Sequence, residues 1–493
     1  MKLLLYTFPL TIWLLLSCGP EKVTDAILSE LQPEIYPDYV DVTIPVNVAP
    51  LNFTMQDDAV DLVDVVIRGE KGGELHAQGR DNTSIDLSEW QSLLSANAGA
   101  SLHLTVSSRD AGGRWTTYRP FDIQVSTDTI PYGICYRLIE PGYEVWSKMG
   151  IYETCLRNSC QQPLIENTQF EGCVNCHSFN RGQTADLSLH IRGPHGATLL
   201  RRGGEMKAYN TSTARTLGSC VYPYWHPSGR YIAYSTNVTR QVFHVMHANR
   251  IEVFDSASDL QVLDLETGEL LLTDLLKQDS VMETFPVFSA DGRTLFFCAT
   301  TGSADELQKL DSIRYNLCCI SFDPETGTYG DSVTVLLDAA SMGKSITFPR
   351  PSYDGRHLVY AMADYGQFSI WHHEADLYIV SVDSLLQHHS FGRSITEINS
   401  PDTESYHSWS ADSRWMVFSS RRGDGLFTRP YFTHVDESGE MTKPFLLPQE
   451  NPRRWYQNLF MSYNVPEFTE APVALDRNEA VRLINSEHRE TFN

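Results

Sequence analysis

Hydrophobic and polar residues alternate in short runs through the first part of the chain, from Val40 to about residue 125. Runs such as Leu102–Val106 and Phe121–Val125 place an apolar side chain at every second position, which is the period of a half-buried β-strand. Glycine-rich and asparagine-rich turns separate the runs. The pattern predicts an immunoglobulin-like β-sandwich over residues 41–126, with one short helical turn at residues 88–94.

A different pattern, a repeat, occupies the rest of the chain. Each copy has an aromatic residue, a short strand, a turn of Asp or Ser that is usually followed by Gly, and an apolar strand. A further hairpin follows each copy, and glycine supplies the positive φ that such a tight turn requires. Four strands per repeat is the unit of a β-propeller. Four clear copies begin at Tyr222, Phe285, Phe348 and Tyr406.

Two weaker copies complete the repeat. The segment that begins at Cys176 aligns His177-Ser-Phe with His407-Ser-Trp of the last clear copy. A further unit would close from strands near residues 134–138 and 151–156 with the C-terminal run 459–465. We therefore predict an all-β chain in which residues 127–465 form a six-bladed β-propeller. Residues 466–493 are expected to be a polar tail, with some helix at residues 478–484.

The four clear copies resemble the repeats of TolB-like, WD40-like (PD40) β-propellers. The resemblance covers roughly residues 130–465 and implies the propeller fold, but it implies little about activity.

The first residues are typical of an export signal. Lys2 precedes an apolar stretch, residues 3–16, that is too short and too interrupted to span a membrane. It ends Leu-Leu-Ser-Cys18, which resembles the bacterial lipobox, in which the cysteine carries the lipid. We expect a signal peptide over residues 1–17, lipid attachment at Cys18 and a linker over residues 18–40. The protein would then be extracytoplasmic and held by acyl chains alone to a bacterial membrane, which we expect to be the outer membrane.

The composition narrows the choice of partners. The formal net charge is −24 over 493 residues, and this field repels nucleic acid because phosphate is also negative. We therefore expect no nucleic-acid partner. The chain has ten cysteines, and exported thiols tend to be paired or otherwise occupied. Cys155 and Cys160 are close enough in sequence to join a short loop.

One motif indicates specific chemistry. Cys173-Val-Asn-Cys176-His177 has the spacing of a covalent c-type haem attachment site. Two thiols separated by two residues reach both vinyl groups of one porphyrin, and the next imidazole is then placed to bind the iron. Two other interpretations remain open: a redox or structural Cys173–Cys176 disulfide, and half of a zinc site. A zinc site would need a second close pair, and Cys318-Cys319 lacks its spacing.

The repeat alignment predicts where this motif lies. His177 is expected at the start of an innermost strand, beside the channel mouth, with the four aromatic residues that open the clear copies forming an apolar floor. We expect His244 to be the second axial iron ligand, and His226 to be a poorer candidate because it lies at the opposite end of its strand. The other candidates for this ligand are His190, His195, Met149 and Met206.

Charged residues near the same mouth are further candidates. Arg421 and Arg422 end the last clear copy and could pair with haem propionates or remain solvated. Glu283 and Glu404 precede matching inner strands and could be paired acids, although polar lining of the channel is the favoured interpretation.

As a whole, the chain resembles lipoproteins of Gram-negative bacteria that join a β-sandwich, a CxxCH segment and a PD40-type propeller. The resemblance implies a covalent haem c on a propeller, with electron transfer or redox sensing as the expected function and a protein as the partner. A scaffold propeller that binds a protein or a glycan, with Cys173–Cys176 as a structural disulfide, is the alternative. A peroxidase-like haem enzyme is a third possibility if the iron keeps an open position.

Overall fold

The computed structural model describes residues 20–140, 148–243, 249, 251–302 and 307–492. The predicted signal peptide, Cys18 and His244 therefore lie outside the described residues. Within them, strands dominate and the chain is all-β, as the alternation predicts. No helix among the described residues is long and apolar enough to cross a bilayer.

The N-terminal domain is built on one seven-stranded sheet and a helix. Strands run in the order β1 (Ile27–Leu28), β8 (Trp115–Thr117), β7 (Ala100–Asp110), β5 (Val60–Gly69) and β6 (Glu74–Gly79), and β9 (Phe121–Ser126) pairs with both β7 and β3 (Thr43–Pro45). Helix α1 (Leu87–Ala96) confirms the predicted helical turn. Its N-cap Asp86 accepts hydrogen bonds from the amides of Ser88 and Glu89 at 2.8 and 3.0 Å, which satisfies two otherwise unpaired donors.

The predicted linker over residues 18–40 is partly wrong. Strand β1 pairs in parallel with β8, and β2 (Ile35–Tyr36) pairs with β4 (Thr54–Met55). Tyr39 is buried, and its hydroxyl donates to the carbonyl oxygen of Leu446 at 3.3 Å. The sequence of this segment is polar, but its edge strands form backbone hydrogen bonds with neighbouring strands, which fix the segment to the domain.

Within the described residues, the rest of the chain forms six sheets, each built on a four-stranded antiparallel meander. Every inner strand is followed by its hairpin partner, except that the first sheet takes its innermost strand from the C-terminal region. From the innermost strand outward, the first sheet has β34 (Ser462–Thr469), β10 (Gly133–Ile139), β11 (Met149–Cys155) and β12 (Gln161–Glu166), and the second has β13 (Cys173–Asn180), β14 (Gln183–Arg192), β15 (Ala197–Arg202) and β16 (Glu205–Asn210). The third sheet has β17 (Cys220–Trp225), β18 (Tyr231–Phe243), β19 (Ile251–Asp264) and β20 (Glu269–Leu271), and the fourth has β21 (Met282–Phe288), β22 (Thr294–Thr300) and β23 (Asn316–Asp323), followed by β24 (Thr328–Tyr329) and β25 (Thr334–Leu337). The fifth sheet has β26 (Ser345–Pro351), β27 (His357–Ala363), β28 (Asp376–Ser381) and β29 (Arg393–Ser394), and the sixth has β30 (Glu404–Trp409), β31 (Trp415–Ser420), β32 (Arg429–His434) and β33 (Phe445–Leu446).

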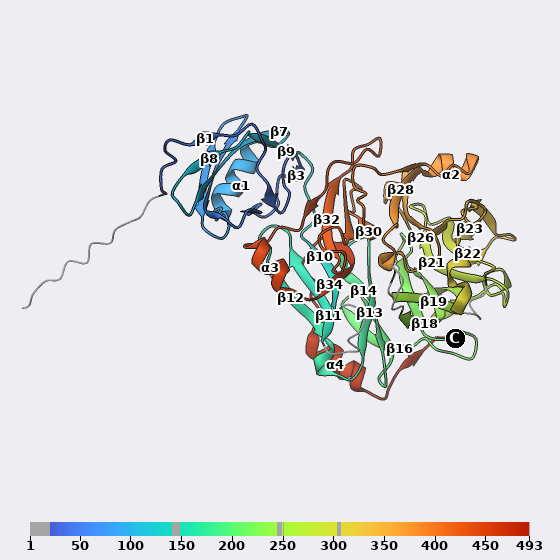
Figure 1. The fold of residues 1–493 in the computed structure, drawn as a ribbon. Coiled ribbons are helices and arrows are strands. Elements are labelled where there is room, and N and C mark those ends of the chain that lie inside the picture. Colours follow the sequence, from blue (N-terminus) through green and yellow to red (C-terminus); the bar gives the residue numbers. More distant parts are fainter. Residues whose placement is uncertain (1–19, 141–147, 244–248, 250, 303–306, 493) are drawn as a thin grey trace, which may run out of the picture.

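The inner strands of these sheets contact one another around a common centre, so the fold is a β-propeller. Each contacts the next along the chain from β13 to β30, and β34 contacts both β30 and β13. The predicted closing strand is therefore present, because β34 pairs with β10 in the first sheet. Figure 1 shows the sheets arranged side by side, with the N-terminal domain on one flank.

A β-bulge at the same place in each inner strand sets the geometry of the centre. The residue at the bulge has positive φ, between 45° and 55°, in all six strands, namely Cys176, Tyr222, Phe285, Phe348, Tyr406 and Val465. The ladder to the neighbouring strand shifts register at each of these positions. A bulge redirects one side chain, and four of these side chains form a chain of aromatic contacts: the Tyr222–Phe285, Phe285–Phe348 and Phe348–Tyr406 ring centroids are 4.7, 5.0 and 4.9 Å apart.

The expected polar tail is wrong as a separate segment. Strand β34 continues to Thr469, helix α4 (Arg477–Asn485) buries Ala480 and Ile484 against the sheet of β13, and β35 (Glu490–Thr491) pairs with β16. The expected helix at residues 478–484 agrees with α4. Helix α2 (Val382–His388) lies between β28 and β29, and helix α3 (Pro452–Asn458) lies between β33 and β34.

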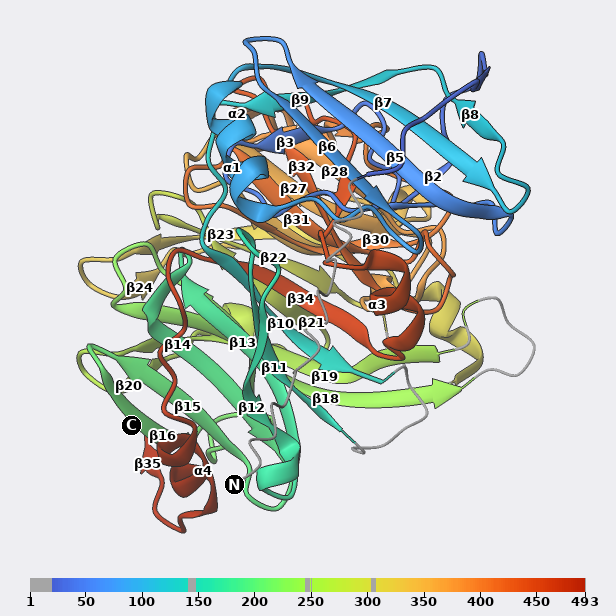
Figure 2. The same cartoon turned by 90° about the vertical axis from the view of Figure 1, so that its left-hand side faces the viewer.

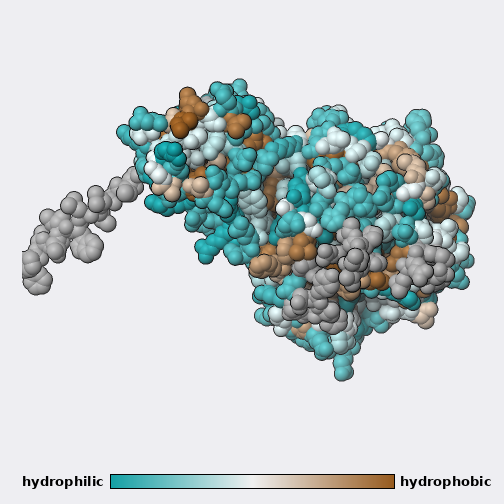
Figure 3. All heavy atoms as spheres, viewed as in Figure 1, coloured by the Kyte–Doolittle hydropathy of each residue, from teal (hydrophilic) through white to brown (hydrophobic). Residues whose placement is uncertain are grey.

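The N-terminal domain and the propeller share one hydrophobic core. Ile44 and Phe53 pack in the same cluster as Trp415 and Phe432 of the last sheet. Figure 2 shows the domain lying over the sheet that contains β30, β31 and β32. Polar contacts reinforce the junction: His434 Nε2 lies 2.7 Å from an Asp128 carboxylate oxygen. The outer surface in Figure 3 is mostly hydrophilic, as the strong net charge would require.

Candidate functional site

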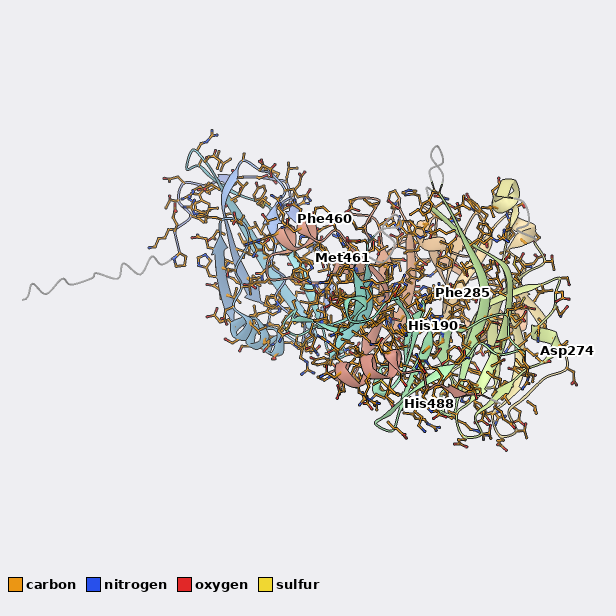
Figure 4. The ribbon with its side chains drawn as sticks, turned by 90° about the horizontal axis from the view of Figure 1, so that it is seen from below. His190, Asp274, Phe285, Phe460, Met461 and His488 are labelled. Atoms are coloured by element: carbon orange, nitrogen blue, oxygen red, sulfur yellow. The ribbon has the colours of Figure 1, made fainter. Side chains whose placement is uncertain are left out.

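The CxxCH motif lies at the start of inner strand β13, as the repeat alignment predicts. Cys176 occupies the bulge position that an aromatic residue holds in four other sheets. Because cysteine is small, the ring of aromatic side chains is open at this point. Figure 4 shows Phe285, one member of that ring, inside the propeller.

A cavity of about 380 Å³ opens beside the motif. Cys173, Cys176 and His177 all line it. Its apolar walls come from Tyr222, Phe348, Phe368, Trp371 and Tyr406, and the charged residues around it are Arg137, Glu140, Arg192, Arg240, Arg350 and Arg421. Five arginines and one glutamate thus face one cavity in a chain whose net charge is −24.

The imidazole of His177 is already engaged with the neighbouring sheet. Its Nε2 lies 3.3 Å from the carbonyl oxygen of Cys135, and burial lowers the pKa of His177 to about 4, so the ring is neutral. His407 makes the equivalent contact, with Nε2 3.0 Å from the carbonyl oxygen of Val359 and a pKa that burial lowers to about 3. Both histidines therefore join an inner strand to the adjacent sheet.

None of the nine cysteines that the structure describes forms a disulfide. Cys173 and Cys176 are unpaired, as are Cys155 and Cys160, so neither the alternative Cys173–Cys176 disulfide nor a Cys155–Cys160 bridge is present. Burial raises the pKa of the Cys176 thiol, while the positive charges of Arg192 and Arg137 act in the opposite direction. Burial is the larger effect, so the thiol of Cys176 is protonated at neutral pH.

The structure separates the candidates for a second axial ligand. Met149 is buried and lines the cavity. His190 is also interior, as Figure 4 shows, but its Nδ1 lies 3.2 Å from Thr198 Oγ1 and it is not among the residues that line the cavity. Met206 packs in the hydrophobic core beneath α4, and His195 does not line the cavity. Of the described candidates, Met149 alone reaches the site.

His226 is structural, which agrees with its expected lower rank. Its Nε2 lies 3.1 Å from the carbonyl oxygen of Gly292, and its Nδ1 lies 2.8 Å from Ser228 Oγ. It therefore joins the turns of two adjacent sheets at the end of the propeller opposite the bulge.

The two arginines that end the last clear copy have different surroundings. Arg422 pairs with Glu404 at 3.0 Å, donates to Ser420 and is not among the residues that line the cavity, which favours the alternative of a charge pair for this arginine. Arg421 is 4% exposed, and its guanidinium lies 3.9 Å above the ring of Trp371. Among the described residues it forms no ion pair, and its Nε has no hydrogen-bond partner.

Glu283 and Glu404 do not form a pair of acids. Glu404 accepts hydrogen bonds from Ser400, Ser420 and Arg422. Glu283 lines a separate pocket; burial and the nearby Asp259 raise its pKa to about 9, and its Oε2 has no hydrogen-bond partner within the described part of the chain.

Sequence reasoning missed Arg137, Arg192 and Trp371. Arg192 stands directly across the ladder from Cys173, and Arg137 donates to the Oδ1 of Asn175, which lies between the two cysteines. Arg192 could have been predicted from the sequence, because it ends the strand that pairs with the strand of the motif. Arg137 and Trp371 could not, since they come from other sheets.

A porphyrin is consistent with most of this site. The two thiols, the aromatic walls and the surplus of arginines suit a planar apolar group that carries carboxylates. His177 would have to release the carbonyl oxygen of Cys135 before its Nε2 could bind iron. No group of three or more His, Cys, Asp and Glu side chains in the described ranges is arranged to hold a bare metal ion.

Comparisons with known proteins add little. No family model and no curated protein matches the chain. Weak structural similarity extends to a prolyl endopeptidase (11% identity, 71% of this chain and 49% of that one, TM-score 0.31). It also extends to dipeptidyl peptidase 4 from Porphyromonas gingivalis (9% identity, 72% and 59%, TM-score 0.30) and an endo-arabinase from Bacteroides thetaiotaomicron (10% identity, 54% and 90%, TM-score 0.27).

This chain spans about half of the endopeptidase and about three-fifths of the dipeptidyl peptidase. Identities and scores this low transfer no activity to this chain.

Proposed function

We propose that this protein is an exported lipoprotein whose propeller carries one covalent haem c, for electron transfer or redox sensing. In this proposal residues 127–465 are a six-bladed propeller of the TolB-like, PD40 type, and residues 41–126 are an immunoglobulin-like domain. Cys18 carries the lipid and holds the protein to the outer membrane of a bacterium, which metabolic labelling with a radioactive fatty acid would test. The redox partner would be another protein.

One observation carries the haem proposal: the two thiols and the histidine of the CxxCH motif line the same cavity at the centre of the propeller. Cys173 and Cys176 would hold the porphyrin by thioether bonds and His177 would bind its iron. Met149 is the second iron-binding candidate among the described residues, and His244 is the candidate outside them. A bound haem would supply a one-electron redox centre whose potential depends on its ligands and its exposure. The chain's own contribution is an apolar, positively charged pocket that excludes bulk water from one side of the group.

The test is expression of the full exported chain together with a c-type maturation system. We expect a haem-stained band that survives denaturing electrophoresis, and we expect the double variant C173A/C176A to lose it. A colourless wild-type protein that folds normally would contradict the proposal.

The matched pair H177Q and H407Q separates iron binding from structural support. Both substitutions remove an equivalent contact to a neighbouring carbonyl oxygen, so each should lower stability by about 1 kcal/mol. Only H177Q should change the optical spectrum of the haem. If the two variants have the same spectrum as the wild type, His177 is a structural residue and the iron has another ligand.

A further inference from the structure

The arginines of the central cavity have few acidic partners among the described residues. Arg421 is the clearest case, because it is 4% exposed and stacks on Trp371. Its Nε is buried without a hydrogen-bond partner among the residues that the structure describes. Burying an arginine in this way is unfavourable unless a partner compensates for the lost water.

The acidic residues near Arg421 do not provide that compensation. Asp402 and Asp424 favour its charged form from a distance, but neither forms an ion pair with it. Asp402 instead pairs with Nδ1 of His373 at 2.8 Å, and Asp424 accepts hydrogen bonds from the amides of Leu426 and Phe427. Burial lowers the pKa of Arg421 only to about 10, so the guanidinium is charged at neutral pH.

Of the four other arginines that line the same cavity, two lie beside the CxxCH motif. Arg192, which lies across the ladder from Cys173, has no ion pair in the described ranges. Arg137 is oriented by its hydrogen bond to Asn175. The described lining has one carboxylate, Glu140, against these charges. The walls between them are aromatic, so the space suits a planar apolar body with acidic substituents.

We propose that Arg421, assisted by Arg192, is a carboxylate-binding subsite for the propionate side chains of a porphyrin in the central cavity. The identity of the ligand rests on the proposed haem function, but the subsite itself does not require covalent attachment or iron. Arginine suits this role because its planar fork donates two parallel hydrogen bonds to one carboxylate.

The test uses the full mature chain made without haem maturation, with mesoporphyrin IX and its dimethyl ester as probes. Mesoporphyrin has no vinyl groups, so it cannot form thioethers, and without iron it does not depend on His177. The ester has the same planar body but no carboxylate. Fluorescence titration should show the free acid binding at least about tenfold more tightly than the ester.

Substitution then assigns the preference to a residue. R421Q should remove most of the difference between acid and ester, R421K should keep part of it, and R192Q should weaken it. R414Q is the matched control, because Arg414 pairs with Glu437 at the surface and does not line the cavity. Cooperative unfolding of each variant shows whether it is folded, and if R421Q is not, R421K and R192Q decide.

Equal binding of acid and ester, or a preference that R421Q and R192Q leave intact, would overturn the subsite, and so would the failure of both probes to bind. A preference for the acid that R421Q removes, in a protein that never acquires covalent haem, would support the subsite while contradicting the proposed function. Covalent haem in a protein with no such preference would do the reverse.

Discussion

His372 is a buried histidine held between two carboxylates. It is 1% exposed; its Nε2 lies 3.2 Å from Glu252 Oε2, and its Nδ1 lies 3.3 Å from Glu374 Oε1. Burial lowers its pKa, but the hydrogen bond with Glu252 and the charges of Glu252 and Glu374 outweigh burial and raise the pKa to about 9. Tyr365 donates to Glu252 as well, so the ring is one member of a small polar network.

This raised pKa predicts a pH-dependent contribution to stability. Folding favours the protonated ring, so the contribution is fully present below the unfolded pKa of about 6.5 and is lost as pH rises through about 9. H372Q should therefore destabilise the protein by about 3 kcal/mol at pH 6. The difference from wild type should shrink steadily up to pH 10 in unfolding experiments.

The adjacent His373 is the control for this prediction. It also contacts a carboxylate, that of Asp402, but its side chain is 42% exposed. An exposed ion pair contributes about 0–1 kcal/mol, so H373Q should have a small effect. A difference between wild type and H372Q that stays constant from pH 6 to pH 10 would show that the ring is not charged in the folded protein.

At the scale of single elements, the hairpin turns link each sheet to the next. Gly229, Gly292 and Gly355 have φ of 70°, 72° and 77°, as the repeat pattern predicts. In the last clear copy Ser413 takes the same place with φ of 60°. The turn at Gly292 packs directly against His226: a Cβ added at Gly292 would lie 1.9 Å from the Nε2 of that histidine.

G292A and G268A form a matched pair that measures this contact. Both glycines have φ of 72°, but a Cβ at Gly268 would meet nothing within 4 Å. G268A should therefore cost only the left-handed conformation, about 1 kcal/mol. G292A should cost about 1–3 kcal/mol more, because the ring of His226 must move and lose its hydrogen bonds. Equal shifts in the unfolding midpoint would show that the turn relaxes without disturbing His226.

At the scale of the whole molecule, the C-terminal region closes the propeller and then covers one sheet. Strand β34 completes the sheet of β10 and contacts inner strands on both sides. Beyond it, α4 buries Ala480 and Ile484 against the sheet of β13. Closing the propeller and covering a sheet are different roles. Of these C-terminal elements, only β34 pairs with a strand at the centre of the propeller, whose edge would otherwise be unpaired.

Two truncations separate closure from cover. A chain ending at residue 474 keeps β34 and loses α4 and β35, so we expect it to fold with a lower unfolding midpoint. A chain ending at residue 461 loses β34, which exposes the edge of β10 and the central channel, so we expect aggregation or rapid proteolysis. Circular dichroism and limited proteolysis make the comparison. Equal stability of the two truncations would show that ring closure by β34 is not required.

Much of the fold was predictable because its signals are local. Each clear copy of the repeat contains its own turn residues, its own aromatic residue at the bulge and its own alternation of apolar and polar positions. The sheets, the closing strand and α4 could therefore be predicted from the sequence. The linker and the tail were misjudged for the opposite reason. Residues 27–28 and 490–491 pair with strands far away in sequence, and polar edge strands have no hydrophobic signature of their own.

The candidate site divides in the same way. The sequence by itself determined that two cysteines and a histidine begin an inner strand, and that the repeat aligns His177 with His407. Only the tertiary structure decided that both rings contact carbonyl oxygens of adjacent sheets, that Arg422 pairs with Glu404, and that Arg421 joins Arg137 and Arg192 around one cavity. The physical reason is that these partners come from different sheets, and the direction of each side chain depends on how the sheets pack around the centre.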